Sequence, residues 1–386
     1  MIIIRNKFLL RTKMKNLSLV TSAVLLSSTV ALADSNSIKE AFANGTTSGD
    51  ITVYGESIDN KNAKDTGLAS GSIGLNYETD SFKGFSASVG FRANHEFQEV
   101  VDTSDVNPAN HYTYDNTFAN NAIMNVAAVK YATDAYFISV GRQAIDLEWL
   151  GDFNEAVVAG ITAVPDTTII LGYTDRQAEI GFDVVEDFTD VNGNKGAYVV
   201  DVKNNSIENV ELNPYFYSAP DVADFYGLKA SYDNDMFGAT AHYAKSNEDT
   251  QQDGDIYNLE GRLNVVGISF AAGYIGTDKT VGRGSMDAFG DNMSPFEEGN
   301  HTYDPDAKTY YGSIGYEIAG VELAALYGQT KYDNSGIKDK ENELNLSVGY
   351  SFTEELSASL MYVDYDDKST ANGDYDKVFA NVTYSF

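Results

Sequence analysis

Segments of about ten residues, in which apolar and polar side chains alternate, recur along most of this chain. In the segment 344–352, Leu, Leu, Val, Tyr and Phe occupy the even positions, and Asn, Ser, Gly and Ser separate them. Successive side chains of a strand point to opposite faces, so such a segment has one apolar and one polar face. Strands of soluble proteins average about 5–6 residues, whereas a membrane-crossing strand needs about 9–11. The pattern therefore predicts an all-β fold, a transmembrane antiparallel β-barrel.

Eighteen such segments can be placed, nine in each direction. An even number allows a closed antiparallel barrel to bring both chain ends to the same side of the membrane. The predicted strands of one direction cover 47–58, 84–97, 135–142, 167–175, 208–217, 235–246, 266–276, 319–330 and 354–365. The predicted strands of the other direction cover 68–79, 122–133, 157–163, 197–203, 224–233, 255–265, 308–318, 342–352 and 375–386.

The connections between these segments alternate in length. The short ones cover 80–83, 165–166, 233–234, 319–320 and 353–354. The long ones, which are acidic or rich in Gly, cover 98–121, 143–156, 176–196, 277–307, 331–341 and 366–374. Outer-membrane barrels combine short periplasmic turns with long extracellular loops, so we expect the second set to be extracellular. Ahead of the first strand, residues 35–44 indicate a short helical turn with a Ser cap.

The N-terminus has the pattern of an export signal. Lys13 and Lys15 precede the apolar stretch 17–30, and Ala31-Leu32-Ala33 is a small-residue cleavage site. A retained signal anchor is the alternative, but the apolar stretch is shorter than the roughly 20 residues of a spanning helix. The predicted parts are an over-extended start (1–13, with Met14 as the true initiator), a signal peptide that ends at 33, and an outer-membrane barrel (34–386).

Composition excludes several classes of function. The net charge is −31, and the first 33 residues contain basic but no acidic residues, so nucleic acid is not an expected partner. With no Cys, an exported chain holds itself together without disulfides. The chain has no phosphate loop, no GxSxG motif and no zinc-binding spacing. His95 and Glu96, the best acid–base pair, point to opposite strand faces, so we expect neither an enzyme nor a cofactor.

The last segment of the chain is the most specific one. Val378, Ala380, Val382, Tyr384 and Phe386 alternate with polar residues from position 381 onward. An alternating strand that finishes on two aromatic residues resembles the C-terminal assembly signal of outer-membrane barrels. We therefore expect the barrel assembly machinery to recognise Tyr384 and Phe386.

Several short motifs resemble a known family. The segments 37–45 (SIKEAFANG), 48–54 (SGDITVY), 140–143 (VGRQ) and 214–220 (PYFYSAP) are similar to those of major outer-membrane porins of epsilonproteobacteria, which are related to the OprD-type eighteen-stranded porins. The resemblance spans nearly the whole mature chain. It implies an eighteen-stranded barrel, a homotrimer, and a third outer loop that folds inward as a constriction. It does not identify the solute.

If the predicted loop 143–156 folds inward, its carboxylates would raise the local cation concentration. Strand parity directs most of the candidate basic side chains to the lumen, and Arg142 is added because it ends a strand beside the loop. The alternative is that all of these are ordinary solvated charges. The candidate constriction residues are Asp146, Glu148, Asp152, Glu155, Arg92, Lys130, Arg142, Lys229 and Arg262.

Two further features belong to this loop region. Trp149 fits either a membrane belt or an anchor that pins the loop to the wall, and we favour the anchor. The four loop acids are also weak candidates for a Ca²⁺ site. The segment 190–196 resembles a calcium loop, but its Gly is one position late and the acidic residue at the twelfth place is missing, so we interpret it as a turn.

The leading hypothesis is a porin in the outer membrane, in contact with lipid and lipopolysaccharide. It would pass small hydrophilic solutes and ions by diffusion, because about sixteen to eighteen strands leave an aqueous channel. The loop carboxylates would make it prefer cations. The alternatives are a surface adhesin or structural barrel, whose activity would lie in the loops 98–121 and 277–307, and a barrel enzyme.

Overall fold

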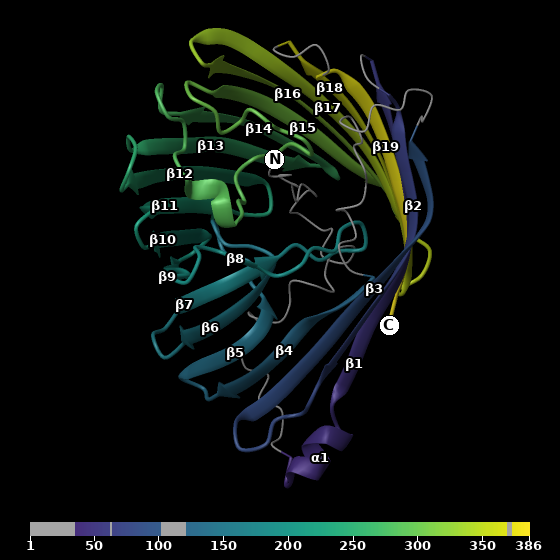
Figure 1. Ribbon diagram of the computed structural model, residues 1–386, viewed down its shortest axis with the longest axis vertical. Coiled ribbons are helices and arrows are strands. Elements are labelled where there is room, and N and C mark those ends of the chain that lie inside the picture. The colour runs from purple at the N-terminus through teal and green to yellow at the C-terminus, as the bar shows by residue number, and fades with distance from the viewer. Residues whose placement is uncertain (1–34, 62–63, 102–120, 369–372) are drawn as a thin grey trace.

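The computed structural model describes residues 35–61, 64–101, 121–368 and 373–386, with the side chains of 98–101 and 334 left undescribed. Almost all of this part is β-strand, and the strands curve around a central space (Figure 1). Within these ranges no helix is long and apolar enough to cross a membrane. The predicted helical turn is present as a six-residue helix, α1, in which the Ser37 hydroxyl caps the Glu40 N–H.

The elements are α1 (Ile38–Ala43), β1 (Thr46–Asn60), β2 (Thr66–Glu78), β3 (Phe85–Val101), β4 (Ala122–Ala132), β5 (Tyr136–Ala144), β6 (Phe153–Ile161), β7 (Thr167–Ala178), β8 (Thr189–Asp190), β9 (Ala197–Ile207), β10 (Val210–Ala219), β11 (Ala223–Asp233), β12 (Phe237–Glu248), β13 (Gly254–Val265), β14 (Ile268–Thr277), η3 (Met286–Phe289), β15 (Lys308–Ile318), β16 (Val321–Asn334), β17 (Ile337–Ser351), β18 (Leu356–Asp367) and β19 (Tyr375–Ser385).

The sheet closes on itself. Each long strand pairs antiparallel with its neighbour in sequence, and β1 also pairs with β19, from Asp50 opposite Ser385 to Asn60 opposite Tyr375. The two-residue β8 pairs only with the end of β7 and lies outside the ring. The other eighteen assigned strands of the described chain form the barrel, which confirms the predicted fold class and strand number.

All strands but one begin and end within four residues of the predicted positions. The predicted 157–163 begins at Phe153, and the exception is the predicted 342–352, which begins at Ile337. The predicted loop 331–341 is therefore wrong: β16 and β17 continue to a turn at 335–336, with Asp333 opposite Lys338. Charged residues gave this stretch the pattern of a loop, yet they pair across two strands.

The outer wall is apolar and bears aromatic residues near both ends. Leu323, Leu346 and Val348 are exposed on adjacent strands. Near the short turns the Phe85 and Tyr131 rings lie 4.7 Å apart, and Tyr384 and Phe386 stack at 6.3 Å. Near the long loops, Tyr274 contacts Tyr257 and Tyr310, with centroids 5.7 and 4.8 Å apart. Two aromatic girdles around an apolar band are the arrangement expected of a membrane barrel.

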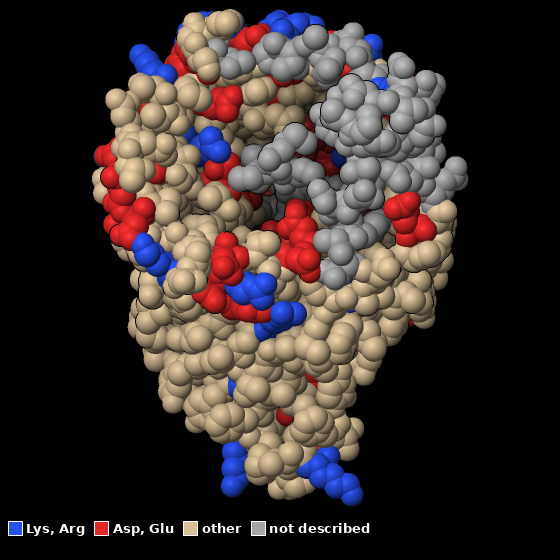
Figure 2. All heavy atoms as spheres, in the orientation of Figure 1, with Lys and Arg blue, Asp and Glu red and all other residues tan. Residues whose placement is uncertain are grey.

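The inner wall is polar and charged. In Figure 2 a hollow faces the viewer, acidic side chains lie around its rim, and the outer wall below carries little charge. The end that holds α1 and the short connections is called the short-turn end here. The opposite end, with the connections 145–152, 179–196 and 278–307, is called the long-loop end. The three connections are called the third, fourth and seventh loops.

Candidate lumen constriction

The third loop is a tight hairpin between β5 and β6. The N–H of Ile145 donates to the carbonyl of Asp152 at 2.8 Å, and that of Leu147 donates to the carbonyl of Leu150 at 2.9 Å. Asp152 adopts a left-handed backbone, with φ of 60°, that lets the chain re-enter β6. These bonds keep the loop compact.

Trp149 pins this hairpin to the inner wall. Its indole is fully buried, and Nε1 donates to the Tyr215 hydroxyl on β10 at 2.8 Å. The Tyr215 hydroxyl in turn lies 2.6 Å from Nε2 of His242 on β12, and the indole lies 6.1 Å from the His242 ring. A single buried aromatic therefore contacts two strands of the wall, which confirms that Trp149 is an anchor.

Glu148 forms the charged contact between the loop and the wall. Its Oε2 accepts from Nζ of Lys229 at 2.7 Å, and Nδ1 of His242 lies 3.5 Å from Oε1. Lys229 and His242 are directly opposite each other on β11 and β12. The side chains of Glu148 and Lys229 are only 6% and 12% exposed, so the ion pair is largely removed from water. The third loop is thus folded into the lumen.

Three other predicted lumen cations, Arg92, Lys130 and Arg262, have their described contacts outside this loop. Arg92 forms two bonds to the Asp50 carboxylate, at 2.5 and 3.1 Å. Arg262 binds Asp233 and Glu260. Lys130 lies 5.1 Å from the Phe137 ring centroid on the neighbouring strand. Of the predicted constriction acids and bases, the described contacts pair Glu148 with Lys229 and Glu155 with Arg142.

The predicted loop boundaries 143–156 require correction. Gln143 belongs to β5 and Glu155 to β6, and the connection itself covers only 145–152. Arg142 stands opposite Glu155 in the ladder, and their side chains form an ion pair at 2.7 Å. The Arg142 guanidinium also lies 4.2 Å from the centroid of the Phe188 ring in the fourth loop. The polar character of Arg142 and Glu155 gave this stretch the pattern of a loop, but cross-strand pairing extends the hairpin.

The four candidate metal ligands are not gathered. Glu148 pairs with Lys229 and Glu155 with Arg142, while Asp146 is exposed and accepts from the amide of Asn292 at 3.3 Å. Within the described ranges no group of three or more acidic or His residues could hold a metal ion. The arrangement gives no support to the predicted Ca²⁺ site.

The seventh loop also folds onto the inner wall, which sequence analysis did not anticipate. The buried carboxylate of Glu343, on β17, accepts from the backbone N–H groups of Glu297 at 2.8 Å and Gly299 at 2.9 Å. Lys377 on β19 binds Glu298 at 2.9 Å. Apolar residues within a nominally solvated loop, such as Met293 and Phe296, were a signal that it packs against protein.

His301 is the central cation of the seventh-loop contact. Its Nδ1 lies 2.6 Å from Asp304 and its Nε2 3.2 Å from Asp367 on β18, and its ring stacks on Tyr332 of β16 at 3.9 Å. Burial opposes protonation, but hydrogen bonds to Asp304 and Asp367, together with the charge of Glu341, raise the pKa of His301 to about 10. The imidazole is therefore an imidazolium at neutral pH.

The fourth loop reaches a different part of the wall. The Asn94 amide, on β3, donates to the carbonyls of Gly181 and Phe182 at 3.2 Å, and the Phe182 ring lies 5.6 Å from that of Tyr54 on β1. Three long-loop connections thus enter the lumen, and only one of them was expected to do so.

The fold and the inward loops define a class: a large, closed, eighteen-stranded β-barrel whose lumen is narrowed by its own loops. No family model matches the chain, and no curated protein matches it. Solved structures do match. OccAB4 of Acinetobacter baumannii aligns with a TM-score of 0.72 and 18% identity over 88% of this chain and 98% of that one.

Two barrels of Pseudomonas aeruginosa are similar to the same extent. OccK3 (OpdO) aligns with a TM-score of 0.73 and 12% identity over 90% of this chain and 97% of that one. The outer membrane protein OpdK aligns with a TM-score of 0.69 and 13% identity over 88% of this chain and 99% of that one. At these identities the likeness establishes a shared fold over nearly the whole barrel.

Proposed function

We propose that this chain is a passive diffusion pore for small hydrophilic solutes and ions, a channel rather than an enzyme, with the third loop as its constriction. The observation that carries the proposal is a closed ring of eighteen strands with a loop docked inside it by Trp149 and Glu148. Barrels of this strand number enclose a lumen wide enough for an aqueous channel. A docked loop would narrow that lumen without closing it.

We place the pore in the outer membrane, in contact with lipid and lipopolysaccharide, with residues 1–33 as a cleaved signal peptide and the long loops outside. The apolar outer band and its two aromatic girdles support this location. Tyr384 and Phe386, exposed on the outer face of the C-terminal strand, would be read by the barrel assembly machinery. The sequence resemblance to epsilonproteobacterial porins supports a homotrimer.

We also propose that the pore prefers cations. Three of the basic side chains of the wall, Arg92, Lys229 and Arg262, are each bound to carboxylates, so their positive charge is locally cancelled. The exposed Asp146 of the third loop adds negative charge where we place the constriction. Carboxylates at a constriction raise the local concentration of cations and repel anions.

The test is to reconstitute residues 34–386 in a planar bilayer under a KCl gradient. We expect stepwise conductance and a reversal potential of the sign for K⁺ preference. The double variant Asp146→Asn and Asp152→Asn should reduce that preference, whereas Asp249→Asn, in a connection outside the lumen loops, should leave it unchanged. A conducting but indifferent double variant would refute the constriction. A folded protein that never conducts would refute the pore and favour the surface adhesin.

A further inference from the structure

Four lysines form a row across the outer face of the barrel, near the long-loop end. In the ladders, Lys308 of β15 stands opposite Lys331 of β16, and Lys331 stands opposite Lys340 of β17. The row continues on β18, where the backbone N–H of Lys368 donates to the carbonyl of Lys340 at 3.1 Å. These strands lie side by side in the upper part of Figure 1. Neighbouring strands are about 4.8 Å apart, so the row is about 14 Å wide.

The side chains of this lysine row point away from the lumen. Lys331 alternates with Thr330 and Tyr332, which are buried on the inner side, and successive side chains of a strand point to opposite faces. Tyr310, two residues after Lys308, belongs to the aromatic girdle at the same end. Aromatic belts sit at the level of the lipid headgroups, so in a membrane the lysine row would lie at or just above that level.

The charge of the lysine row is only partly balanced. Its two end members have carboxylate partners, Asp306 and Asp366. Its two central members, Lys331 and Lys340, contact no carboxylate within the described ranges. Like charges that stand directly opposite each other in a ladder are destabilising, so an anion bound at the centre of the row would relieve a cost that the fold otherwise bears.

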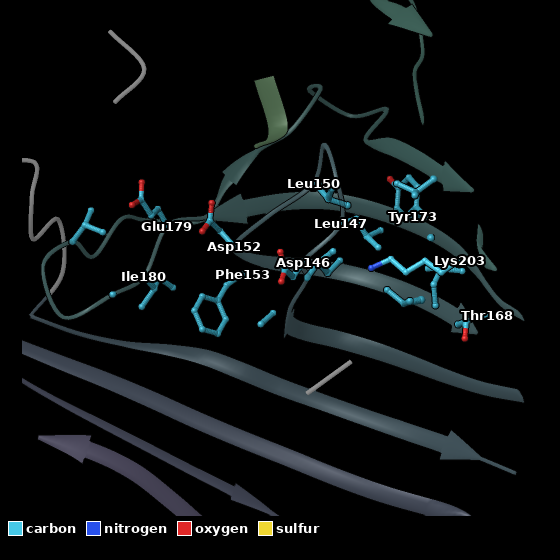
Figure 3. Close-up of a pocket in the computed structure, with 18 of the residues that line it drawn as sticks. Asp146, Leu147, Leu150, Asp152, Phe153, Thr168, Tyr173, Glu179, Ile180 and Lys203 are labelled. Carbon is cyan, nitrogen blue, oxygen red and sulfur yellow. The ribbon is translucent and has the colours of Figure 1, made fainter. Parts of the chain in front are cut away.

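Two lysines of the lumen are placed differently. Lys229 binds Glu148, and Figure 3 shows Lys203 in the cavity beside the third loop, which Asp146 and Asp152 also line. The chain has 57 acidic and 26 basic residues, so carboxylates are abundant. A pair of neighbouring outer lysines without one is the arrangement expected where the anion comes from outside the chain.

An apolar groove of about 640 Å³ lies below the lysine row on the same outer wall. Gly261, Ala272, Gly312 and Tyr327 stand opposite one another on β13 to β16 and line it. A Cβ at Gly261 would meet no atom within 4 Å, so the space above these small residues is open. Gly312 follows Lys308 by four residues on β15, which is about 13 Å along a strand. The groove is therefore placed for the hydrocarbon chains of a molecule whose anionic head meets the row.

We propose that this outer face binds a lipopolysaccharide molecule through the phosphates of its lipid A. The phosphate oxygens would accept charge-assisted hydrogen bonds from Lys331 and Lys340, and an acyl chain would lie in the groove over Gly312. Inorganic phosphate would gain nothing from the groove, and a phospholipid brings a single phosphate to a row about 14 Å wide. The assignment rests on the outer-membrane location proposed above, with the long loops outside.

The experiment counts bound lipids by native mass spectrometry on the folded barrel, residues 34–386, in a maltoside detergent. Diphosphorylated lipid A is titrated in, and we expect one molecule to be retained on each barrel. Lipid A without phosphates, and phosphatidylethanolamine, should each bind at least about tenfold more weakly. Excess inorganic phosphate should not displace lipid A, because it has no acyl chains. This series uses the unmodified protein, so it does not depend on the folding of a variant.

Variants separate the two parts of the site. The double variant Lys331→Gln and Lys340→Gln should weaken lipid A binding by at least about tenfold. The matched control, Lys39→Gln and Lys83→Gln, changes the net charge equally at the exposed short-turn end and should bind as the original does. Gly312→Leu fills the groove without changing any charge and should also weaken lipid A binding.

Equal binding of lipid A with and without its phosphates, displacement by inorganic phosphate, or equal binding by the two double variants would overturn the proposal. If loss of Lys331 and Lys340 instead abolished self-association, seen in the same spectra, the occupant would be a second copy of the chain. KCl conductance in a phospholipid bilayer is measured on the same preparations. A conducting barrel that ignores the phosphates would lose only the lipid site, and a silent barrel that binds lipid A would lose only the pore.

Discussion

At the scale of the residue, sequence determined which side chains face the lumen, but not which partners they meet. Alternation correctly placed Lys229 and Arg262 on the inner face. It could not pair Arg92 with Asp50, because these residues lie 42 positions apart in the chain and meet across β2. Arg142 was placed beside the loop against its own strand parity, and its guanidinium lies 4.2 Å from the Phe188 ring of the fourth loop.

The largely buried pair of Glu148 and Lys229 leads to a prediction about loop docking. Glu148→Gln removes the counter-charge of Lys229, and we expect docking of the third loop to weaken by about 2–4 kcal/mol. Hydrogen exchange of the backbone amides 145–152 should become faster in this variant. Asp146→Asn, an exposed acid of the same loop, is the matched control and should exchange as the original does. Unchanged protection in Glu148→Gln would mean that the ion pair with Lys229 does not hold the loop.

At the scale of the element, strand position was predictable because both the period and the turn residues repeat eighteen times. Loop conformation was not predictable, since it depends on contacts between distant segments. Glu343 shows the reason: its alternation marks a lumen-facing strand residue, but nothing local indicates that it accepts N–H groups from Glu297 and Gly299. The inward third loop was expected only from family resemblance, and the fourth and seventh loops were missed.

The seventh loop yields a prediction of pH dependence. The pKa of His301 is about 10 in the folded protein and about 6.5 when unfolded. The stability it supplies through Asp304, Asp367 and Glu341 is therefore complete below about pH 6.5 and is lost as the pH rises through about 10. The difference in melting temperature between the original protein and His301→Gln, followed by circular dichroism, should shrink above pH 10. A difference that is constant from pH 6 to 11 would contradict this assignment.

At the scale of the whole molecule, the ring depends on one long-range seam. The β1–β19 ladder joins residues as far apart as Thr52 and Thr383, whose hydroxyls lie 3.0 Å apart. In lipid an unpaired strand edge leaves backbone groups without partners, and each one costs several kcal/mol. The even strand count fitted a closed antiparallel barrel, whereas the aromatic C-terminal strand was interpreted only as an assembly signal.

A proline in the seam tests this dependence. Val382 lies between Val53 and Ala358, and Val382→Pro removes one ladder donor in a strand paired on both sides. We expect a cost of about 3 kcal/mol or more and loss of the compact, heat-sensitive form on unheated SDS gels. Val382→Thr keeps the donor and the branched shape, so it should still form that species. Normal migration of the proline variant would show that the barrel closes without this ladder hydrogen bond.

The same seam bears on how such a chain can reach its final state. Every other long-strand pairing joins sequence neighbours, so hairpins can form one after another at low loop-closure cost, whereas the last pairing must bring together segments more than 300 residues apart. Among the strand pairings, the separation in sequence is thus large only at the β1–β19 ladder. In the closed ring, backbone hydrogen bonds between Gly49 and Phe386 join the two ends of the barrel in the way that a hairpin joins two consecutive strands. No strand of the ring is therefore an edge strand. The chain ends therefore occupy one of the eighteen junctions between neighbouring strands, and the backbone ladder at that junction is of the same kind as at the seventeen connected ones.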